Sequence, residues 1–438
     1  MNISKLATFF ANHKLYKGIK LADKVQYESV EKLASIQEEK FMKLIDHAKK
    51  NVPYYKDKLD AVHKVSDISN MPILTKDIIK EFNEEIKATN IEKSRFMANS
   101  TSGSTGESTH FYSDREYSYK KGANLRGDSW AGLNYGERSL HFWGAERDID
   151  KSKSFYKKIK HKYVTKQVIL STYHMSHDDL KEYINIYNDY KPKVIISYPT
   201  PLHHLAQYIE ENNIKVWVPK GIITSAETLF PFQREKIEKV FKTKIFNRYG
   251  CREVGNIAAE CEMHNGLHIY ADRFVVEVVN AKGEECKAGE LGELLITDLD
   301  NYVFPLIRYK IGDLGILSDR ICGCGRNLPL LEKVEGRVFD LIVGVNGNTV
   351  AGTFWTLLRN KIKGFKKFQI LQEETNKLKV IIENNKEIQE GFENQLTDLI
   401  KEKLGNEMQI AIEKVDAIPL TKTGKHRWII SNISPYVQ

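Results

Sequence analysis

The stretch TSGSTGEST, at residues 101–109, decides how the rest of this sequence is interpreted. Glycines let a backbone approach a polyphosphate closely, and hydroxyls and backbone N–H groups can then donate to its oxygens. The stretch lacks the lysine of the GxxxxGK[ST] loop of kinases and GTPases, so it is another kind of loop. Taken alone, it is also compatible with a polar surface loop. The candidate phosphate cradle comprises Thr101, Ser102, Gly103, Ser104, Thr105 and Gly106.

Two downstream motifs combine an aromatic residue with a carboxylate. YGCRE, at residues 249–253, offers Tyr249 for stacking on a purine and Glu253 for holding Mg²⁺. YKIGD, at residues 309–313, ends at Asp313, whose carboxylate suits two ribose hydroxyls. Each motif is weak alone, since an aspartate after glycine is usually part of a turn.

Two further motifs lie near the C-terminus. EGRVFD, at residues 335–340, contains Arg337 and is the predicted hinge between two units. PLTKTGK, at residues 419–425, places Lys425 on a glycine-bearing loop. Five such motifs in this order favour an enzyme that binds and uses a nucleotide.

The length and the hydrophobic patterns predict an α/β fold in two domains. A chain of 438 residues exceeds one usual core. Apolar runs such as VIIS (194–197) and GIIT (221–224) alternate with helical patterns, as in a layered α/β domain. An amphipathic helix is predicted over residues 29–50, and it ends before Pro53.

The pattern changes after about residue 265. Short alternating strands separated by glycine and aspartate turns predict a small antiparallel sheet or β-barrel portion attached to the α/β core. The last hundred residues predict a β-β-α-β unit, whose helix begins near Lys386 and ends at Gly405. The predicted domains are therefore a large N-terminal domain, 1–336, and a small mobile α+β C-terminal domain, 337–438.

With these motifs, the sequence resembles the adenylate-forming superfamily of acyl-CoA ligases, luciferases and nonribosomal adenylation domains. Within it, the likeness is greatest to phenylacetate–CoA ligases and their relatives found with capsule-polysaccharide genes, and it spans nearly the whole chain. Further matching segments are NVPYY (51–55), PILTK (72–76), SYP (197–199), SAE (225–227) and GKHR (424–427).

The resemblance implies that ATP and a carboxylic acid react to give acyl-AMP and pyrophosphate, followed by transfer of the acyl group to CoA. An alternative acceptor is an amine, on a sugar or an amino acid. An alternative of another class is a nucleotide-binding protein without catalysis. The implied fold is the large α/β domain with a small mobile C-terminal domain.

The resemblance also assigns roles to individual residues. The loop from Thr101 to Gly106 would cradle the phosphates, Glu253 would bind Mg²⁺, and Lys425 would stabilise the α-phosphate and the attacking carboxylate. The implied nucleotide-binding residues beyond that loop are Ala226, Glu227, Tyr249, Gly250, Arg252, Asp313 and Arg337. The implied acid-binding residues are Tyr198 and Pro199.

Three positions depart from the family pattern. Thr109 stands where many members have a lysine, although the phenylacetate branch also tends to lack it. Phe339 replaces the usual acidic residue of the hinge, and Arg252 stands where threonine is commonest. These differences affect the details of phosphate contacts and hinge motion and leave the reaction class unchanged.

A second constellation has the spacing of a metal site. Cys322 and Cys324 flank a glycine, and Cys261 begins the segment CEMHNGLH that ends at His268. Two convergent thiolates with a Cys/His pair can complete a closed tetrahedral zinc site. His268 is the preferred fourth ligand over His264, and reduced structural cysteines are the alternative. Some relatives in the branch carry a structural zinc of this kind.

Composition excludes several other classes. The net charge of +8 is small for this length, and the basic run at 151–166 has no nucleic-acid reader module beside it. No apolar stretch reaches the roughly 20 residues that cross a bilayer. An odd number of cysteines, five in a long chain, argues against a disulfide framework. The short apolar patch at residues 6–11 is too brief for a signal peptide, so we expect a cytoplasmic protein. Whether it forms a homodimer is left open.

Overall fold

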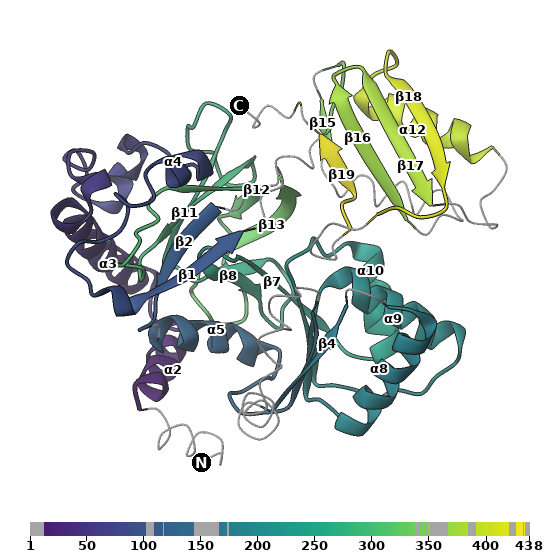
Figure 1. Cartoon of the computed structure of the whole chain (residues 1–438), viewed down its shortest axis with the longest axis horizontal. Coiled ribbons are helices and arrows are strands. Elements are labelled where there is room, and N and C mark those ends of the chain that lie inside the picture. Colours follow the sequence, from purple (N-terminus) through teal and green to yellow (C-terminus); the bar gives the residue numbers. More distant parts are fainter. Residues whose placement is uncertain are drawn as a thin grey trace. The chain divides into compact units, whose positions relative to one another are not determined.

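The computed structural model describes residues 13–101, 109–116, 118–143, 166–172, 175–337, 342–346, 348–350, 367–383, 391–419, 426–431 and 433. These residues form two compact units, each built from two stretches of the chain (Figure 1). The first unit contains residues 1–137 and 246–334, and the second contains residues 138–245 and 335–438. The predicted boundary near residue 336 stays a prediction, because these units divide the chain by contacts and not by motion.

The first unit begins with helices and a hairpin. Its helices are α2 (His13–Val25), α3 (Val30–Asn51), α4 (Lys76–Glu81) and α5 (Ser118–Trp130), with 3₁₀ turns η1 (Pro53–Tyr55), η2 (Val65–Asn70) and η3 (Lys93–Arg95). The hairpin consists of β1 (Phe96–Thr101) and β2 (Thr109–Asp114), paired antiparallel from Phe96↔Asp114 to Thr101↔Thr109.

The prediction of a helix over residues 29–50 is confirmed by α3. The Ser29 hydroxyl caps it by accepting a hydrogen bond from the Lys32 amide. Val52, which precedes a proline, is extended and closes the helix with its N–H bonded to the Ala48 carbonyl.

The strands of the first unit follow the order β10-β11-β12-β13-β9-β8-β7. Their bounds are β7 (Ile245–Cys251), β8 (Gly255–Glu260), β9 (Leu267–Ile269), β10 (Phe274–Val279), β11 (Leu291–Asp298), β12 (Tyr309–Ser318) and β13 (Leu330–Arg337). The pairs β10–β11, β11–β12, β7–β8, β8–β9 and β13–β9 are antiparallel, which confirms the antiparallel sheet predicted after residue 265.

The YGCRE motif overlaps the end of strand β7. Its first three residues belong to β7 itself, because Tyr249 pairs with Ala258 and Cys251 pairs with Gly255 of β8. Arg252 and Glu253 lie in the turn after the strand.

The helices α2 and α5 pack closely against each other in the first unit (Figure 1). At their crossing, a Cβ on Gly18 would meet the Ser118 carbonyl, and one on Gly122 would meet the Gly18 backbone. Behind this crossing, the Arg126 guanidinium donates two hydrogen bonds to the Asp272 carboxylate, and both side chains are fully buried. The first unit therefore contains a fully buried ion pair between α5 and the residue two positions before β10.

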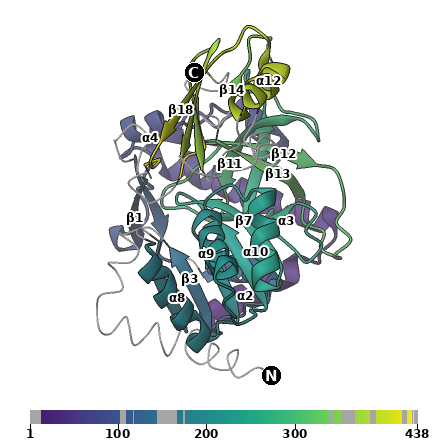
Figure 2. The same cartoon turned by 90° about the vertical axis from the view of Figure 1, so that its right-hand side faces the viewer.

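The second unit contains a parallel α/β layer with strand order β4-β3-β5-β6. The strands are β3 (Ser139–Trp143), β4 (Gln167–Ser171), β5 (Val194–Ser197) and β6 (Gly221–Ser225), and the helices are α8 (His177–Tyr190), α9 (Pro199–Glu211) and α10 (Pro231–Phe241). The helices lie side by side in Figure 2, and their apolar faces share one core with the strands. This layer confirms the buried strands predicted at 194–197 and 221–224.

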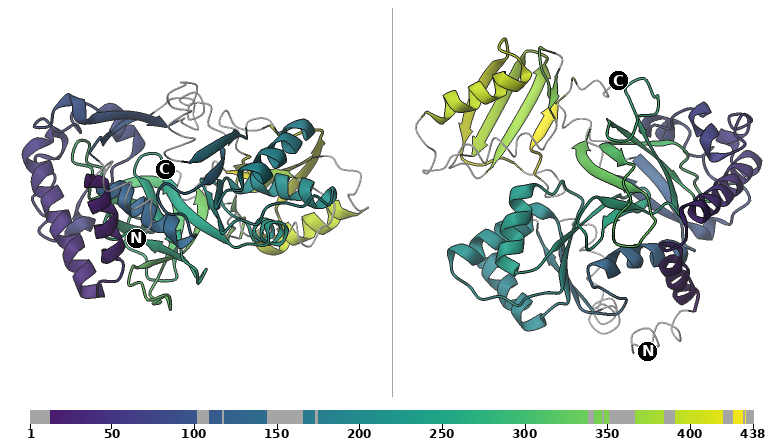
Figure 3. Two further views of the ribbon diagram at one scale, coloured as in Figure 1. Left: turned by 90° about the horizontal axis from the view of Figure 1, so that it is seen from below. Right: turned by 180° about the vertical axis from the view of Figure 1, so that it is seen from behind.

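The C-terminal part of the second unit has a core of its own. Its elements are β14 (Ile342–Val343), β15 (Thr349–Val350), β16 (Phe368–Glu374), β17 (Lys377–Glu383), α12 (Phe392–Leu404), β18 (Gln409–Val415) and β19 (Ile429–Ser431). The helix α12 covers one face of the β18-β17-β16-β19 sheet (Figure 3). The β-β-α-β order is thus confirmed, the predicted start near Lys386 lies outside the described residues, and β19 was not predicted.

Among the described helices, none combines the length and the apolar character that a membrane crossing requires.

Candidate functional site

Two carboxylates of the first unit are held by a reciprocal pair of tyrosines. The Tyr249 hydroxyl, on β7, donates to Asp313 Oδ2 on β12 at 2.8 Å. The Tyr309 hydroxyl, at the start of β12, donates to Glu253 Oε1 beyond the end of β7 at 3.0 Å. Each motif therefore positions the acid of the other, and the YGCRE and YKIGD motifs form one site.

Burial determines the protonation of the groups around Glu253. Burial, and then the neighbouring Glu253 carboxylate, raise the pKa of Tyr309 well above its usual value, so its hydroxyl stays a donor. Burial followed by the same carboxylate also raises the pKa of Cys251, which therefore stays a neutral thiol. A neutral thiol at this position suits packing and not nucleophilic attack.

The glycine of the YGCRE motif is required by a close backbone approach. A Cβ on Gly250 would collide with the Gly255 carbonyl of the paired strand β8. The register of the β7–β8 ladder also shifts between Tyr249 and Gly250. A β-bulge of this kind redirects the chain, and here it precedes Arg252 and Glu253.

The second unit brings together the residues predicted to line the adenine and the acid. Ala226 follows β6 with a φ of +68°, a left-handed conformation that is uncommon for alanine. Glu227 Oε2 accepts a hydrogen bond from the Thr200 amide at 3.1 Å, and Thr200 follows Pro199 at the start of α9. The carboxyl ends of β5 and β6 meet here, where open α/β sheets commonly bind ligands.

Tyr198 lies at the same edge of the second unit. It caps α9 in an extended conformation, and Pro199 occupies the first turn of the helix. The Tyr198 ring packs against Trp143, at the end of β3, with ring centroids 4.4 Å apart. Both aromatic residues are therefore positioned at the ends of adjacent parallel strands.

Several predicted site residues lie wholly or partly outside the described residues. Thr101 is described as the last residue of β1 and Arg337 as the last residue of β13, without their side chains. The residues that lie outside altogether are Ser102, Gly103, Ser104, Thr105, Gly106, Phe339, Asp340, Lys425 and most of the basic run at 151–166. Their roles stay predictions.

The four predicted metal ligands converge in the first unit. The ligand atoms of Cys261, His268, Cys322 and Cys324 all lie within 4.8 Å of one another. Two of the distances within this set are 3.7 Å, between the sulfurs of Cys261 and Cys322, and 3.3 Å, between Cys324 Sγ and His268 Nε2. Tetrahedral zinc, with Zn–S near 2.3 Å and Zn–N near 2.05 Å, requires about 3.8 and 3.6 Å for such pairs. Both of these pairs therefore lie within a few tenths of an ångström of the separations that zinc requires.

The surroundings of the cluster favour metal binding through His268. Its Nδ1 lies 3.1 Å from the Leu328 carbonyl, which can only accept, so Nδ1 carries the proton and Nε2 keeps a free lone pair. His268 is fully buried, whereas His264 contacts Glu260 at 3.4 Å and is absent from the cluster. The structure thus places His268, not His264, among the thiols.

The thiols of Cys261 and Cys324 differ in acidity. Burial raises the pKa of Cys261 to about 12. Burial also acts to raise the pKa of Cys324, but hydrogen bonds from the backbone and side chain of Arg326 outweigh it and lower that pKa. Three thiolates around Zn²⁺ carry one excess negative charge, and the Arg326 guanidinium lies beside them to offset it.

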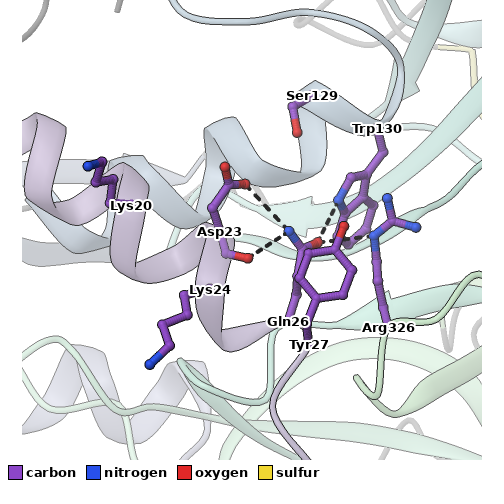
Figure 4. Close-up of a pocket in the computed structure, with 8 residues that line it drawn as sticks. All are labelled: Lys20, Asp23, Lys24, Gln26, Tyr27, Ser129, Trp130 and Arg326. Carbon is purple, nitrogen blue, oxygen red and sulfur yellow. Dashed lines mark hydrogen bonds between the residues drawn. The ribbon is translucent and has the colours of Figure 1, made fainter.

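The cysteine loop is tied to the end of α2 by Gln26. Gln26 Oε1 accepts from Arg326 Nε at 3.0 Å and from Trp130 Nε1 at 2.9 Å (Figure 4). These residues line a surface pocket of about 480 Å³, together with Tyr27, Ser129 and three residues of α2. The pocket borders the Cys/His cluster and not the pair of carboxylates, so we assign it no part in nucleotide binding.

Sequence reasoning assigned no role to Tyr309, although its motif was identified. The available signal was the shared spacing of the two motifs, since each has a tyrosine four residues before its acid. The exchange of partners between the motifs became visible only when β7 and β12 were placed in space.

Known proteins match this chain in sequence and in fold. Residues 342–432 match the family model of the CapK C-terminal domain. The chain is 26% identical to protein CapK of Staphylococcus aureus, over 93% of this chain and 92% of that protein. It is 27% identical to a phenylacetate–coenzyme A ligase of Escherichia coli (strain K12), over 74% of this chain and 76% of the ligase.

A solved structure shares the fold. The chain superposes on 2-hydroxyisobutyryl-CoA ligase, in its postadenylation state with a bound acyl-AMP, with a TM-score of 0.76, at 17% identity and over 94% of this chain and 92% of that one. At this identity the superposition shows the fold of an adenylate-forming ligase. The chain is therefore similar in sequence to CapK and to phenylacetate–CoA ligases, and it shares the fold of an adenylate-forming ligase.

Proposed function

We propose that this protein activates a carboxylic acid with ATP, forming an acyl-adenylate and releasing pyrophosphate, and then transfers the acyl group to CoA. The observation that carries the proposal is the reciprocal bracing of Glu253 by Tyr309 and of Asp313 by Tyr249. This bracing gives two carboxylates fixed positions in one unit of an adenylate-forming fold, as preorganised ligands for a metal ion and a sugar.

The two acids suit different parts of Mg·ATP. Glu253 is 6% exposed and has one oxygen occupied by the Tyr309 hydroxyl, which leaves carboxylate lone pairs for an oxygen-seeking cation. Asp313 accepts from Tyr249 with one oxygen, and its carboxylate would accept from the ribose hydroxyls. The Tyr249 ring would stack on the adenine.

The remaining nucleotide roles are proposals of the same origin. Ala226 and Glu227 would line the adenine, Arg252 and Arg337 would contact phosphate or ribose, and Gly250 would let the backbone approach the nucleotide. The loop from Thr101 to Gly106 would cradle the phosphates. Lys425 would stabilise the charge that develops when the carboxylate attacks the α-phosphate.

The acid would bind at the ends of β3 and β5. Tyr198 and Pro199, with Trp143 packed against the tyrosine ring, offer an apolar and aromatic surface there. Such a surface favours an acid with an apolar or aryl body over a highly charged one.

ATP–pyrophosphate exchange, screened over aryl, alkyl and amino acids, tests the first half-reaction. The wild type should exchange label with at least one acid. Lys425→Ala should slow this exchange by raising its activation free energy by about 3–4 kcal/mol, the effect of losing one oxyanion donor. Glu253→Gln keeps the shape and removes the charge, and it should lower exchange strongly. Glu290→Gln, the same change at an exposed carboxylate, should not. Wild-type protein that exchanges with no acid would refute the proposal.

The acceptor is tested separately, with the acid that supports exchange. Adding CoA should consume the acyl-adenylate and yield a thioester. If CoA yields no thioester while an amine on a sugar or amino acid yields an amide, the second half-reaction is amide formation and the CoA step is wrong.

We also propose that Cys261, His268, Cys322 and Cys324 hold a structural zinc ion. The support is the convergence of the four ligand atoms within 4.8 Å and the protonated Nδ1 of His268. A site with four protein ligands is closed, so it leaves no position for a reactive water. Metal analysis should give one zinc per chain in the wild type and markedly less in Cys322→Ser.

A further inference from the structure

The PILTK segment, at residues 72–76, was singled out in the sequence but has no part in the site described so far. It is attached to the start of β12 by two backbone hydrogen bonds. The Leu74 amide donates to the Arg308 carbonyl at 3.0 Å, and the Lys310 amide donates to the Leu74 carbonyl at 2.9 Å. The Thr75 hydroxyl then caps α4, whose first residue is Lys76. The segment thus has a defined position beside Tyr309.

This attachment brings an ammonium group to the proposed magnesium ligand. Lys76 Nζ lies 3.9 Å from Glu253 Oε1, the oxygen that accepts from the Tyr309 hydroxyl. The Lys76 side chain is 37% exposed, and that of Glu253 is 7% exposed. The distance exceeds a hydrogen bond, so Lys76 is near the carboxylate without being bound to it. Its partly exposed ammonium can therefore turn toward a ligand on the solvent side of Glu253.

Two other cations near the start of β12 form ion pairs with protein carboxylates. Lys310 pairs with Glu293 at 2.9 Å, and Arg308 pairs with Glu277 at 3.0 Å. Both of these pairs are closer than the contact of Lys76 with Glu253.

The same part of the unit lies beside the hairpin that carries the polar stretch TSGSTGEST. Asn83, just beyond α4, donates from Nδ2 to the His110 carbonyl of β2 at 2.8 Å. The two ends of the stretch, Thr101 and Thr109, pair with each other in that hairpin. The stretch contains neither lysine nor arginine. Triphosphate sites gather a lysine or arginine as well as Mg²⁺, because several negative charges must be offset together.

We propose that Lys76 is a phosphate-binding residue of this site, which contacts the β- and γ-phosphates of ATP and holds the pyrophosphate until it leaves. The inference rests on the proposed use of ATP, and it extends that proposal to the leaving group. Lys76 and the metal on Glu253 would then approach the polyphosphate from adjacent positions. AMP and an acyl-adenylate lack both of those phosphates, so their binding would not need Lys76.

Direct binding measurements test the proposal without knowledge of the acid. The probes are Mg·ATP, magnesium pyrophosphate and AMP, titrated into wild type, Lys76→Ala, Lys76→Arg and Lys80→Ala. Lys80, one turn along α4 beside Asp77, is the matched control. We expect Lys76→Ala to weaken ATP and pyrophosphate about 10- to 100-fold, the range for one charge-assisted hydrogen bond, and to leave AMP within about twofold. Lys76→Arg should recover part of the loss, and Lys80→Ala should match the wild type.

Two outcomes would overturn the role of Lys76. One is unchanged affinity of Lys76→Ala for ATP and pyrophosphate. The other is full recovery of that affinity at high Mg²⁺, since the lysine would then act only through Glu253. If wild type binds ATP but exchanges label with no acid, the proposed reaction fails, and the binding comparison still decides the role of Lys76. As a check on folding, Lys76→Ala should unfold at the melting temperature of the wild type.

Discussion

Replacement of Cys322 by serine should cost the first unit most of the stability that a metal ion would give it. The variant removes one of four ligands whose atoms converge within 4.8 Å, and it leaves Cys261, Cys324 and His268 in place. If zinc affinity falls about 1,000-fold at a free zinc level that saturates the wild type, the lost stabilisation is about 4 kcal/mol. In a unit of about 200–250 residues this corresponds to a fall of roughly 8–16 °C in melting temperature.

The assay is thermal unfolding of the full chain, with and without a zinc chelator, beside metal analysis of each sample. Cys286→Ser is the matched control, because Cys286 is a partly buried thiol that contacts the Leu291 carbonyl and lies outside the cluster. Its melting temperature should stay within a few degrees of the wild type. The chelator should lower the melting temperature of the wild type and of Cys286→Ser, but scarcely that of Cys322→Ser. Native wild type that is free of metal and unfolds at the same temperature as Cys322→Ser would refute the argument.

Three further predictions concern other parts of the chain. Tyr249→Phe removes the hydroxyl that donates to Asp313, so KM for ATP should rise about 3- to 10-fold with kcat nearly unchanged. An unaltered KM would contradict the assignment of Asp313 to the ribose site. Arg126→Met leaves Asp272 buried without its main partner and should destabilise the protein by about 3–5 kcal/mol in denaturant unfolding, a loss that Asp272→Leu added to it should partly reverse. Burial lowers the pKa of His426 from its ordinary 6.5 to about 4. The free energy of unfolding should therefore be unaffected above pH 6.5 and fall by at most about 1.4 kcal/mol per pH unit as the pH drops toward 4. His426→Gln should remove this part of the pH dependence.

Features with a local signal were predictable from the sequence. The helix α3 carries its amphipathic pattern, its serine cap and its proline stop within about 25 residues, and all three behave as expected. Gly405 ends α12 with a φ of +106°, as its position after the last apolar residue indicated. The convergence of the cysteines was also predictable, because Cys322 and Cys324 flank a glycine that brings both sulfurs to one side.

Features that depend on distant pairing were not predictable. The strand β19 has three residues, and it is a strand because it pairs in parallel with β16, about 60 residues earlier in the chain. The contact of Lys76 with Glu253 depends on the bridge between Leu74 and Tyr309, which lies outside any sequence window. In both cases the tertiary partner, and not the local propensity, determines the position of the residue.

The proposed zinc cluster and the proposed ATP site lie along one antiparallel ladder. This arrangement predicts how loss of the metal affects nucleotide affinity. Cys261 directly follows β8, and His268 lies in β9, so the two ligands close the β8–β9 hairpin. The other edge of β8 pairs with β7, which holds Tyr249 opposite Ala258. Loss of the metal would loosen the hairpin end first, while the ladder between β7 and β8 retains its own hydrogen bonds and buried side chains. Chelation should therefore lower the melting temperature at concentrations that leave nucleotide affinity at 25 °C almost unchanged. Equal losses of both at the lowest effective chelator concentration would mean that the metal acts on the site directly.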